Sequence, residues 1–192
     1  MTNLGHLIIF VKEPKVGKVK TRLAEDIGPI TATYWYRRQL DHLLNTFKPS
    51  SPYAKHLFVT PHGGLKYFRP YTKQGWRLCR QSPGDLGEKM TSAFLSVGHG
   101  PKLLIGSDIP AVSRQHIVLA FKQLNSFDAV FGPAQDGGYW LIGLSRFVVP
   151  PKLEHVRWST KYALSDTLSK FSPKVSVKLI PTLKDVDRAS DL

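Results

Sequence analysis

Short apolar runs alternate with amphipathic stretches along almost the whole chain, and this alternation constrains the fold more than any other feature. Seven runs have the length and composition of strands: residues 7–12, 56–60, 76–80, 102–106, 129–132, 139–144 and 175–180. Four intervening stretches place apolar residues at helical spacing: residues 31–47, 85–97, 113–125 and 163–170. Alternating strands and helices predict an α/β sandwich around a mostly parallel sheet.

Length and composition are typical of one folded domain. The 192 residues are 42% hydrophobic and 11% aromatic, which is enough apolar surface to bury a core and excludes a disordered chain. We find no repeat, low-complexity tract or linker, and Pro150 and Pro151 mark a loop rather than a boundary. We therefore expect a single domain over residues 1–192.

Cysteine content and hydropathy indicate the cellular compartment in which the protein is expected. The only cysteine, Cys79, excludes an intramolecular disulfide framework and a cysteine-rich metal site. The apolar run at residues 7–11 is too short for a signal sequence or a membrane span, and no later run is longer. We expect a cytoplasmic protein without membrane insertion.

The loop that follows the first strand is strongly basic. In VKEPKVGKVKTRL, five cations surround Gly17, namely Lys12, Lys15, Lys18, Lys20 and Arg22. Like charges gathered at a strand end repel one another unless an anion binds there. The candidates are nucleotide phosphates, a nucleic-acid backbone, or solvent alone. The segment matches neither the Walker loop nor the dinucleotide GxGxxG pattern.

Ligands of open parallel sheets bind beyond the carboxyl ends of the strands, so acidic residues after strands are candidates for the site. Asp108 in GSDIP directly follows the run at residues 102–106, where a carboxylate can hold Mg²⁺ against a phosphate or simply form an Asx turn. Asp85 in GDLGEK either contacts a nucleoside or caps a helix.

Two further loops leave similar alternatives open. The stretch Asp136-Gly137-Gly138-Tyr139 is either a tight turn or a place where a sugar or base lies on bare backbone. The carboxylates of Asp185-Val186-Asp187 either reach the metal or belong to a polar tail. The seven histidines have no metal-ligand spacing, which favours structural roles for them.

Together the loops carry a recognisable order of motifs. These are K-x-P-x-x-G-x-V-K-T-R-L, G-D-L-G-E-K-M, G-S-D-I-P, P-A-Q-D-G-G-Y-W-L-I-G-L, W-S-T and D-V-D-x-x-x-D-L. The series resembles an uncharacterised bacterial family of the nucleotide-diphospho-sugar transferase superfamily, akin to the guanylyltransferases of deazaflavin cofactor synthesis and the molybdenum-cofactor nucleotidyltransferases. The resemblance runs from Phe10 to Leu192. It implies a GT-A type, Rossmann-like α/β/α sandwich of three layers with a mixed, mostly parallel sheet.

The resemblance also implies roles for individual residues. It places the nucleotide phosphates on the first loop and the nucleoside near Asp85, with the phosphates held by Gly17, Lys18, Lys20 and Arg22. It makes Asp108 a ligand of Mg²⁺ or Mn²⁺ and Asp187 a second one. The acceptor or sugar would lie against Asp136, Gly137, Gly138, Tyr139 and Trp158. Lys12 and Lys15 receive no role beyond solubility.

This chain departs from the family pattern in three places. Lys89 stands where arginine is usual and Gln135 where an acidic residue is common. The sequence Arg188-Ala189-Ser190 replaces the typical Thr-Pro-Glu.

The reaction divides into two enzyme classes. As a glycosyltransferase, the chain would use Lys20 and Arg22 to stabilise a departing nucleoside diphosphate and Asp136 as the base. As a nucleotidyltransferase, it would use the same cations to neutralise departing pyrophosphate. We favour the first, with a nucleotide or nucleotide sugar and a small-molecule acceptor as partners. A homodimer stays open because no sequence feature argues for one.

A non-catalytic nucleic-acid-binding protein is a third alternative. The net charge of +13 and a pI near 9.9 are compatible with it. However, the basic residues outside the first loop are scattered, and no known nucleic-acid motif is present.

Overall fold

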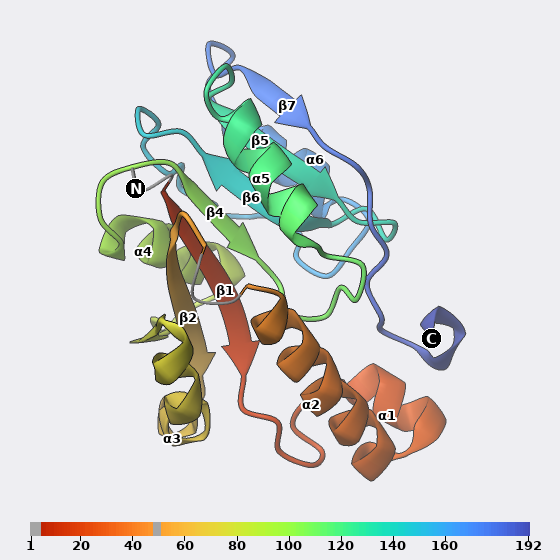
Figure 1. The fold of residues 1–192 in the computed structure, drawn as a ribbon. Helices are drawn as coiled ribbons and strands as arrows, with labels where there is room; N and C mark the ends of the chain where they lie inside the picture. Colours follow the sequence, from red (N-terminus) through yellow and green to blue (C-terminus); the bar gives the residue numbers. More distant parts are fainter. Residues whose placement is uncertain (1–4, 48–50) are drawn as a thin grey trace.

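A computed structural model describes residues 5–47 and 51–192 of the chain (Figure 1). Its strands are β1 His6–Lys12, β2 Ala54–Thr60, β3 Trp76–Arg80, β4 Lys102–Ile105, β5 Ala129–Pro133, β6 Tyr139–Leu144 and β7 Val177–Leu179. Its α-helices are α1 Thr21–Ile27, α2 Pro29–Thr46, α3 Leu65–Phe68, α4 Leu86–Ser96, α5 Arg114–Gln123 and α6 Ala163–Leu168. Three short 3-10 helices complete the set: η1 His62–Gly64, η2 Arg69–Gln74 and η3 Ala189–Asp191.

The seven strands form one mixed sheet with β1 near its centre. Their order is β3-β2-β1-β4-β6-β5-β7. Every neighbouring pair is parallel except those that include β6, which runs antiparallel to both β4 and β5. The PAQDGG turn between β5 and β6 is therefore the hairpin that its sequence predicts. The carboxyl ends of β1 and β4 lie at one edge, so their loops meet there.

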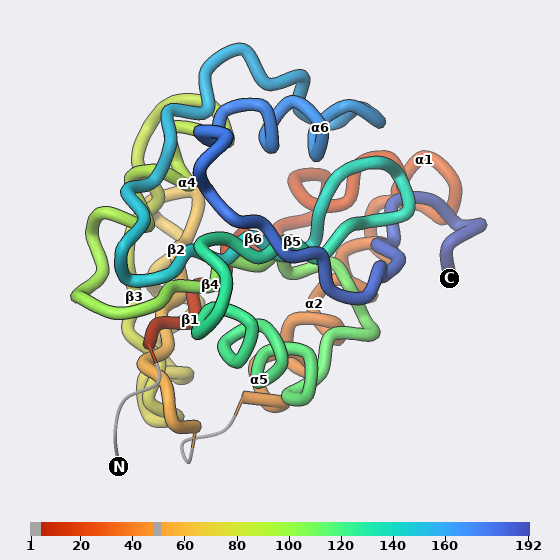
Figure 2. The backbone as a smooth tube through the Cα atoms, turned by 90° about the horizontal axis from the view of Figure 1, so that it is seen from above, coloured from red at the N-terminus to blue at the C-terminus, as the bar shows by residue number. Residues whose placement is uncertain are grey.

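Helices cover both faces of the sheet and complete the three layers. Helices α2 and α5 pack on one face and α4 and α6 on the other (Figure 2). Buried side chains alternate between the faces along β1, because Leu7 and Ile9 join the cluster under α2 and α5 while Ile8 joins the one under α4. The predicted fold class is confirmed.

Most predicted elements are present with small changes at their ends. The strands at residues 76–80 and 139–144 have the predicted bounds, whereas β7 is shorter than predicted. The helix expected over residues 31–47 begins earlier, because Gly28 adopts a positive φ of 83° and Pro29 suits the first helical position. The helical turns between residues 62 and 74 were not predicted, since such short pieces carry too few residues for a periodic pattern.

Two predicted helix starts are confirmed by their capping contacts. Asp85 accepts a hydrogen bond from the Glu88 amide at 2.9 Å, and the Glu88 carboxylate accepts one from the Asp85 amide at 2.8 Å. Ser113 and His116 form the corresponding reciprocal pair at the start of α5. Within residues 5–47 and 51–192, no helix combines the length and the apolar character that a membrane crossing requires.

The C-terminal segment returns from β7 to the start of the chain and packs beside α1 (Figure 1). Val186 is buried with Leu23 and Ala32, which come from α1 and α2. Arg188 pairs with Glu25 at 2.8 Å and with Asp26 at 3.5 Å. The arginine that departs from the family pattern thus anchors this segment to α1.

Candidate active site

A cleft with two adjoining parts lies where the loops after β1, β4 and β5 meet the C-terminal segment. The cationic hollow, of about 440 Å³, is lined by Lys12, Lys18, Lys20, Arg22, Tyr36, Ser107, Asp187 and their neighbours. The apolar-acidic cavity, of about 220 Å³, is lined by Leu86, Met90, Asp136, Tyr139, Trp158, Asp185 and their neighbours. Phe10, Asp108 and Ser159 line both parts, so the parts are continuous.

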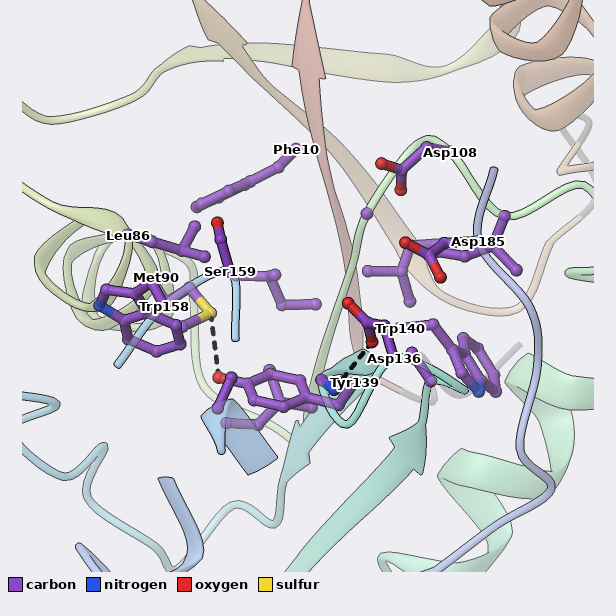
Figure 3. A pocket seen from close by; sticks show the side chains of 18 of the residues that line it. Phe10, Leu86, Met90, Asp108, Asp136, Tyr139, Trp140, Trp158, Ser159 and Asp185 are labelled. Carbon is purple, nitrogen blue, oxygen red and sulfur yellow. Dashed lines mark hydrogen bonds between the residues drawn. The ribbon is translucent and has the colours of Figure 1, made fainter. Parts of the chain in front are cut away.

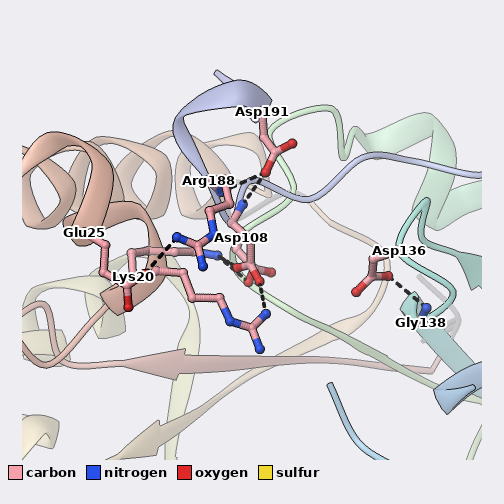
Figure 4. A network of polar contacts seen from close by, with 9 residues as sticks. Lys20, Glu25, Asp108, Asp136, Gly138, Arg188 and Asp191 are labelled. Carbon is pink, nitrogen blue, oxygen red and sulfur yellow. Dashed lines mark hydrogen bonds and ion pairs between the residues drawn. The ribbon is translucent and has the colours of Figure 1, made fainter. Parts of the chain in front are cut away.

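Lys20 joins the two predicted metal ligands at the boundary of the parts (Figure 4). Its ammonium donates to Asp108 Oδ2 at 2.8 Å and to Asp187 Oδ1 at 3.0 Å. Arg22 Nη1 donates to the other oxygen of Asp187 at 2.8 Å. Residues that lie far apart in the sequence therefore form one network of alternating charges.

The ion pairs change the proton affinity of the groups that form them. Burial alone would lower the pKa of Lys20, but attraction and hydrogen bonds from Asp108 and Asp187 outweigh it and raise the pKa above its ordinary value. Burial alone would raise the pKa of Asp187, but Lys20 and Arg22 lower it overall. Lys20 and Asp187 are therefore both charged at neutral pH.

Backbone geometry at Lys20 directs this side chain. Lys20 has φ 47° and ψ 50°, a left-handed conformation that residues other than glycine rarely adopt. It is the N-cap of α1, and its side chain is only 8% exposed. Such backbone strain persists where surrounding contacts hold it, and the two carboxylates are those contacts here.

A tyrosine of α2 contacts the loop that carries Asp108. The buried hydroxyl of Tyr36 lies 3.0 Å from Ser107 Oγ and accepts a hydrogen bond from the Lys12 amide at 3.1 Å. The Val186 amide donates to the Asp108 carbonyl at 3.2 Å. These contacts connect the end of β1, the loop after β4 and the C-terminal segment.

The cations of the first loop fall into two groups. Lys12, Lys18, Lys20 and Arg22 line the cationic hollow. Lys15 does not line it, and its ammonium pairs with Glu13 at 2.9 Å. The sequence interpretation of Lys15 agrees with this placement, whereas Lys12 lies closer to the site than we expected.

Gly17 and Asp85 lie outside the cleft lining. Gly17 forms the turn of the first loop with φ 70°. The carboxylate of Asp85 is occupied by the cap of α4, which was the structural alternative for this residue. Their assignment to nucleotide binding stays a prediction.

The hairpin between β5 and β6 forms one side of the apolar-acidic cavity. Asp136 accepts a hydrogen bond from the Gly138 amide at 2.8 Å, so the tight turn and the candidate site coincide (Figure 4). The Tyr139 hydroxyl accepts from Thr167 at 3.3 Å and donates to the Met90 sulfur at 3.8 Å. Burial raises the pKa of Tyr139, so its phenol stays protonated.

Gly137 does not line the cavity, but it allows two segments that form the cavity to approach each other closely. A Cβ at this residue would meet the backbone of Lys161 at 2.4 Å to 2.8 Å, and the Gly137 carbonyl accepts from the Leu164 amide at 3.1 Å. The hairpin can therefore approach the segment that carries Trp158. That segment is also held by Arg157, which pairs with Asp166 at 2.8 Å.

The converging carboxylates fit a divalent cation. Asp108 and Asp187 both lie within hydrogen-bonding distance of Lys20 Nζ, so they share a common centre. Mg²⁺ usually takes one or two protein carboxylates and completes its octahedron with substrate phosphates and water. Among the described residues, no group of three or more potential ligands could hold a metal by itself. Asp108 and Asp187 could supply two carboxylates of such a coordination shell.

Sequence reasoning placed Asp185 in a candidate loop without giving it a role of its own, and it missed Tyr36. Asp185 lines the cavity, and the D-V-D spacing could have indicated it, since a buried Val186 leaves its neighbours on the opposite side of an extended chain. Tyr36 lies on a helix whose apolar pattern explains it as core, so no sequence signal marked its contact with Ser107.

Comparison with known structures defines the class of protein. The chain is similar to a protein of Desulfovibrio desulfuricans G20 proposed to be a nucleotide-diphospho-sugar transferase, with 30% identity, a TM-score of 0.88, and coverage of 97% of this chain and 84% of that one. It shares its fold, at 9% identity and a TM-score of 0.63, with 4-diphosphocytidyl-2C-methyl-D-erythritol synthase from Anaerococcus prevotii DSM 20548, covering 98% and 94%. It likewise shares the fold of a CMP:2-keto-3-deoxy-manno-octonic acid synthetase complexed with CTP, at 7% identity and a TM-score of 0.60, covering 97% and 94%. These three proteins share the fold of this chain.

Residues 43–160 match the family described as "Uncharacterized protein conserved in bacteria (DUF2064)", and the chain belongs to that family. No curated protein matches the chain. The resemblance stated from the motifs is confirmed.

Proposed function

We propose that this protein is a metal-dependent glycosyltransferase that uses a nucleoside diphosphate sugar. The observation that carries the proposal is the bridge from Lys20 to Asp108 and Asp187 at the mouth of a cavity. An ammonium between two carboxylates marks a centre where a metal and the phosphates of a nucleotide can be held together.

In this proposal the diphosphate lies in the cationic hollow. Asp108 and Asp187 would hold Mg²⁺ or Mn²⁺ once the Lys20 ammonium turns from them to the phosphates, and the metal would supply Lewis-acid stabilisation of the diphosphate charge. Lys20 and Arg22 stabilise the negative charge that grows on the departing nucleoside diphosphate, and Lys18 contributes to phosphate binding.

The acceptor lies in the apolar-acidic cavity against Gly138, Tyr139 and Trp158. A hydroxyl or amino group of the acceptor attacks the anomeric carbon of the sugar and loses its proton to Asp136. The bond from that carbon to the diphosphate oxygen breaks as the new bond forms, and the nucleoside diphosphate departs with the electron pair.

Nucleotidyl transfer is the second candidate, and the four cations lining the cationic hollow support it. Here an acceptor oxygen attacks the α-phosphorus of a nucleoside triphosphate and pyrophosphate leaves. Four cations match a triphosphate at least as well as a diphosphate.

A thermal-shift panel tests both candidates. Nucleotide sugars and nucleoside triphosphates are compared with and without Mg²⁺, since a ligand that binds only the folded state raises the melting temperature. We expect a Mg²⁺-dependent increase that Asp108→Asn abolishes and that Glu154→Gln, a neutralised surface carboxylate, preserves. An increase in melting temperature with triphosphates but not with nucleotide sugars would refute glycosyl transfer and favour nucleotidyl transfer. An unchanged response in Asp108→Asn would refute the metal assignment.

A further inference from the structure

The apolar-acidic cavity has two walls of opposite chemistry (Figure 3). The carboxylates of Asp108, Asp136 and Asp185 lie along one side, whereas Leu86, Met90 and Trp158 lie on the other. We propose that the cavity takes an acceptor without negative charge, which presents a hydroxyl or amino group to Asp136 and Asp185 and an apolar face to Met90 and Trp158. The inference names the acceptor class within the proposed function and rests on that function.

The charge of the lining is the first argument. The chain has 27 Lys and Arg against 14 Asp and Glu, so an average surface would present about two cations for each carboxylate. The residues that line this cavity in the described part of the chain include three carboxylates and no lysine, arginine or histidine. A phosphate or carboxylate on the acceptor would face Asp136 and Asp185, and no described cationic side chain lines the cavity beside them.

The state of the carboxylates is the second argument. Asp108 is engaged by Lys20, and one oxygen of Asp136 accepts from the Gly138 amide. Asp185 forms no ion pair with any described residue. Its carboxylate is half-buried in the cavity lining. A hydroxyl or ammonium group of the acceptor that donates to Asp185 would give this carboxylate the partner that no described cation supplies.

The apolar wall is the third argument. Leu86 is 41% exposed at the start of α4, Met90 follows one helical turn later, and Trp158 lies on the same side of the cavity as both. Phe10 and Tyr139 close the ends of this wall. The cavity measures about 220 Å³, while an apolar cavity of about 150 Å³ already binds benzene. A six-membered ring with a short polar arm therefore fits.

The cationic hollow has the opposite balance of charge from the apolar-acidic cavity. This difference assigns the nucleotide to the hollow and the acceptor to the cavity. Lys12, Lys18, Lys20 and Arg22 line it, and of the cavity residues only Phe10, Asp108 and Ser159 are shared. The anionic substrate is drawn to one part and repelled from the other, so the electrostatic field orients both substrates before any transfer occurs.

Three probes of one shape and different charge test the inference on the full chain. They are 2-phenylethylamine, 2-phenylethanol and phenylacetate, with binding measured by ligand-observed nuclear magnetic resonance at millimolar concentration. We expect the amine and the alcohol to bind roughly tenfold more tightly than phenylacetate, because like charge opposes only the last. Equal or tighter binding of phenylacetate overturns the inference, and so does the failure of all three to bind.

Two variants assign the selectivity to the cavity. Asp185→Asn should reduce the preference for the amine over phenylacetate, and Leu86→Lys, at an exposed position on the rim, should improve binding of phenylacetate. Glu154→Gln removes the same charge outside the cavity and should change nothing. If Asp185→Asn behaves like this control, Asp185 does not recognise the acceptor and the inference fails.

The nucleotide panel keeps the two proposals apart. If nucleotides bind with Mg²⁺ but phenylacetate binds more tightly than the amine, the acceptor class is refuted and the proposed transferase function is not. Selective binding of the amine without any Mg²⁺-dependent nucleotide response refutes the transferase and leaves the chemistry of the cavity established.

Discussion

Lys20 Nζ lies 2.8 Å from Asp108 Oδ2 although 88 residues separate the two in the sequence. The same ammonium reaches Asp187 across a separation of 167 residues. The lysine therefore occupies the centre on which both carboxylates converge, and its charge offsets the repulsion between them.

Lys20→Ala should make the protein more sensitive to divalent metal. Without the ammonium, two half-buried carboxylates face each other, and we expect a loss of about 1–3 kcal/mol in the free energy of unfolding. Mg²⁺ should recover more stability in this variant than in the original chain. Urea denaturation with and without Mg²⁺ measures the difference. Lys18→Ala, from the same loop, is the control, and equal metal responses in both variants would contradict the shared centre.

Asp185 and Asp187 should respond to neutralisation in opposite directions. The folded pKa of Asp185 is raised, so its charge opposes folding at neutral pH, and Asp185→Asn should increase stability there. This gain should vanish as pH falls through the raised pKa and the native carboxyl takes up its proton. The folded pKa of Asp187 is lowered, so Asp187→Asn should decrease stability at neutral pH, with the difference shrinking in acid. Thermal unfolding across pH gives both curves, and parallel curves would show that the two environments are alike.

Tyr36→Phe should loosen the loop that carries Asp108. The change leaves Ser107 Oγ and the Lys12 amide without the phenol oxygen, at a cost of about 1–3 kcal/mol in unfolding free energy. Nucleotide binding with Mg²⁺ should weaken as well, because Asp108 is no longer held in place. Isothermal calorimetry measures this effect. Tyr34→Phe, at an exposed position of the same helix, should leave both quantities unchanged.

Gly137→Ala should damage the cavity more than Gly17→Ala damages the first loop. Both glycines have positive φ, so alanine costs about 1–2 kcal/mol at either position through backbone strain. Only at residue 137 would the new Cβ also meet the Lys161 backbone, since nothing lies within 4 Å of a Cβ at residue 17. We expect the larger loss of stability and of probe binding at residue 137. Equal losses would mean that the hairpin and the Trp158 segment do not depend on this close approach.

The buried pair of His6 and His56 should make the fold sensitive to mild acid. Their ring nitrogens lie 3.1 Å apart, both residues are at most 6% exposed, and burial lowers both pKa values, that of His56 to about 4. The unfolded state takes up protons first as pH falls below about 6.5, so stability should fall by about 2 kcal/mol between about pH 7 and about pH 5 from His56 alone. Lys102 and Arg77 oppose protonation of His6 further. His56→Gln should flatten this dependence in urea titrations, and an unchanged slope would assign it to other groups.

The strands, the main helices and the parallel core were predictable because each is specified by local periodicity. Leu7, Ile8 and Ile9 are all buried, which is why the first strand reads as a continuous apolar run. The helix starts expected at residues 85 and 113 were predictable because the capping hydrogen bonds of Asp85 and Ser113 span only three residues.

The sequence by itself determined the fold class, the family and which loops carry charge, since these follow from short patterns read in order. Only the tertiary structure decided that Lys20 lies between Asp108 and Asp187, because three loops distant in the chain meet where β1 and β4 end. It also decided that Asp185 belongs to the cavity while Asp85 does not. A carboxylate in a sequence has no surroundings, whereas in the folded chain its neighbours determine whether it caps a helix, pairs with a lysine or faces a ligand.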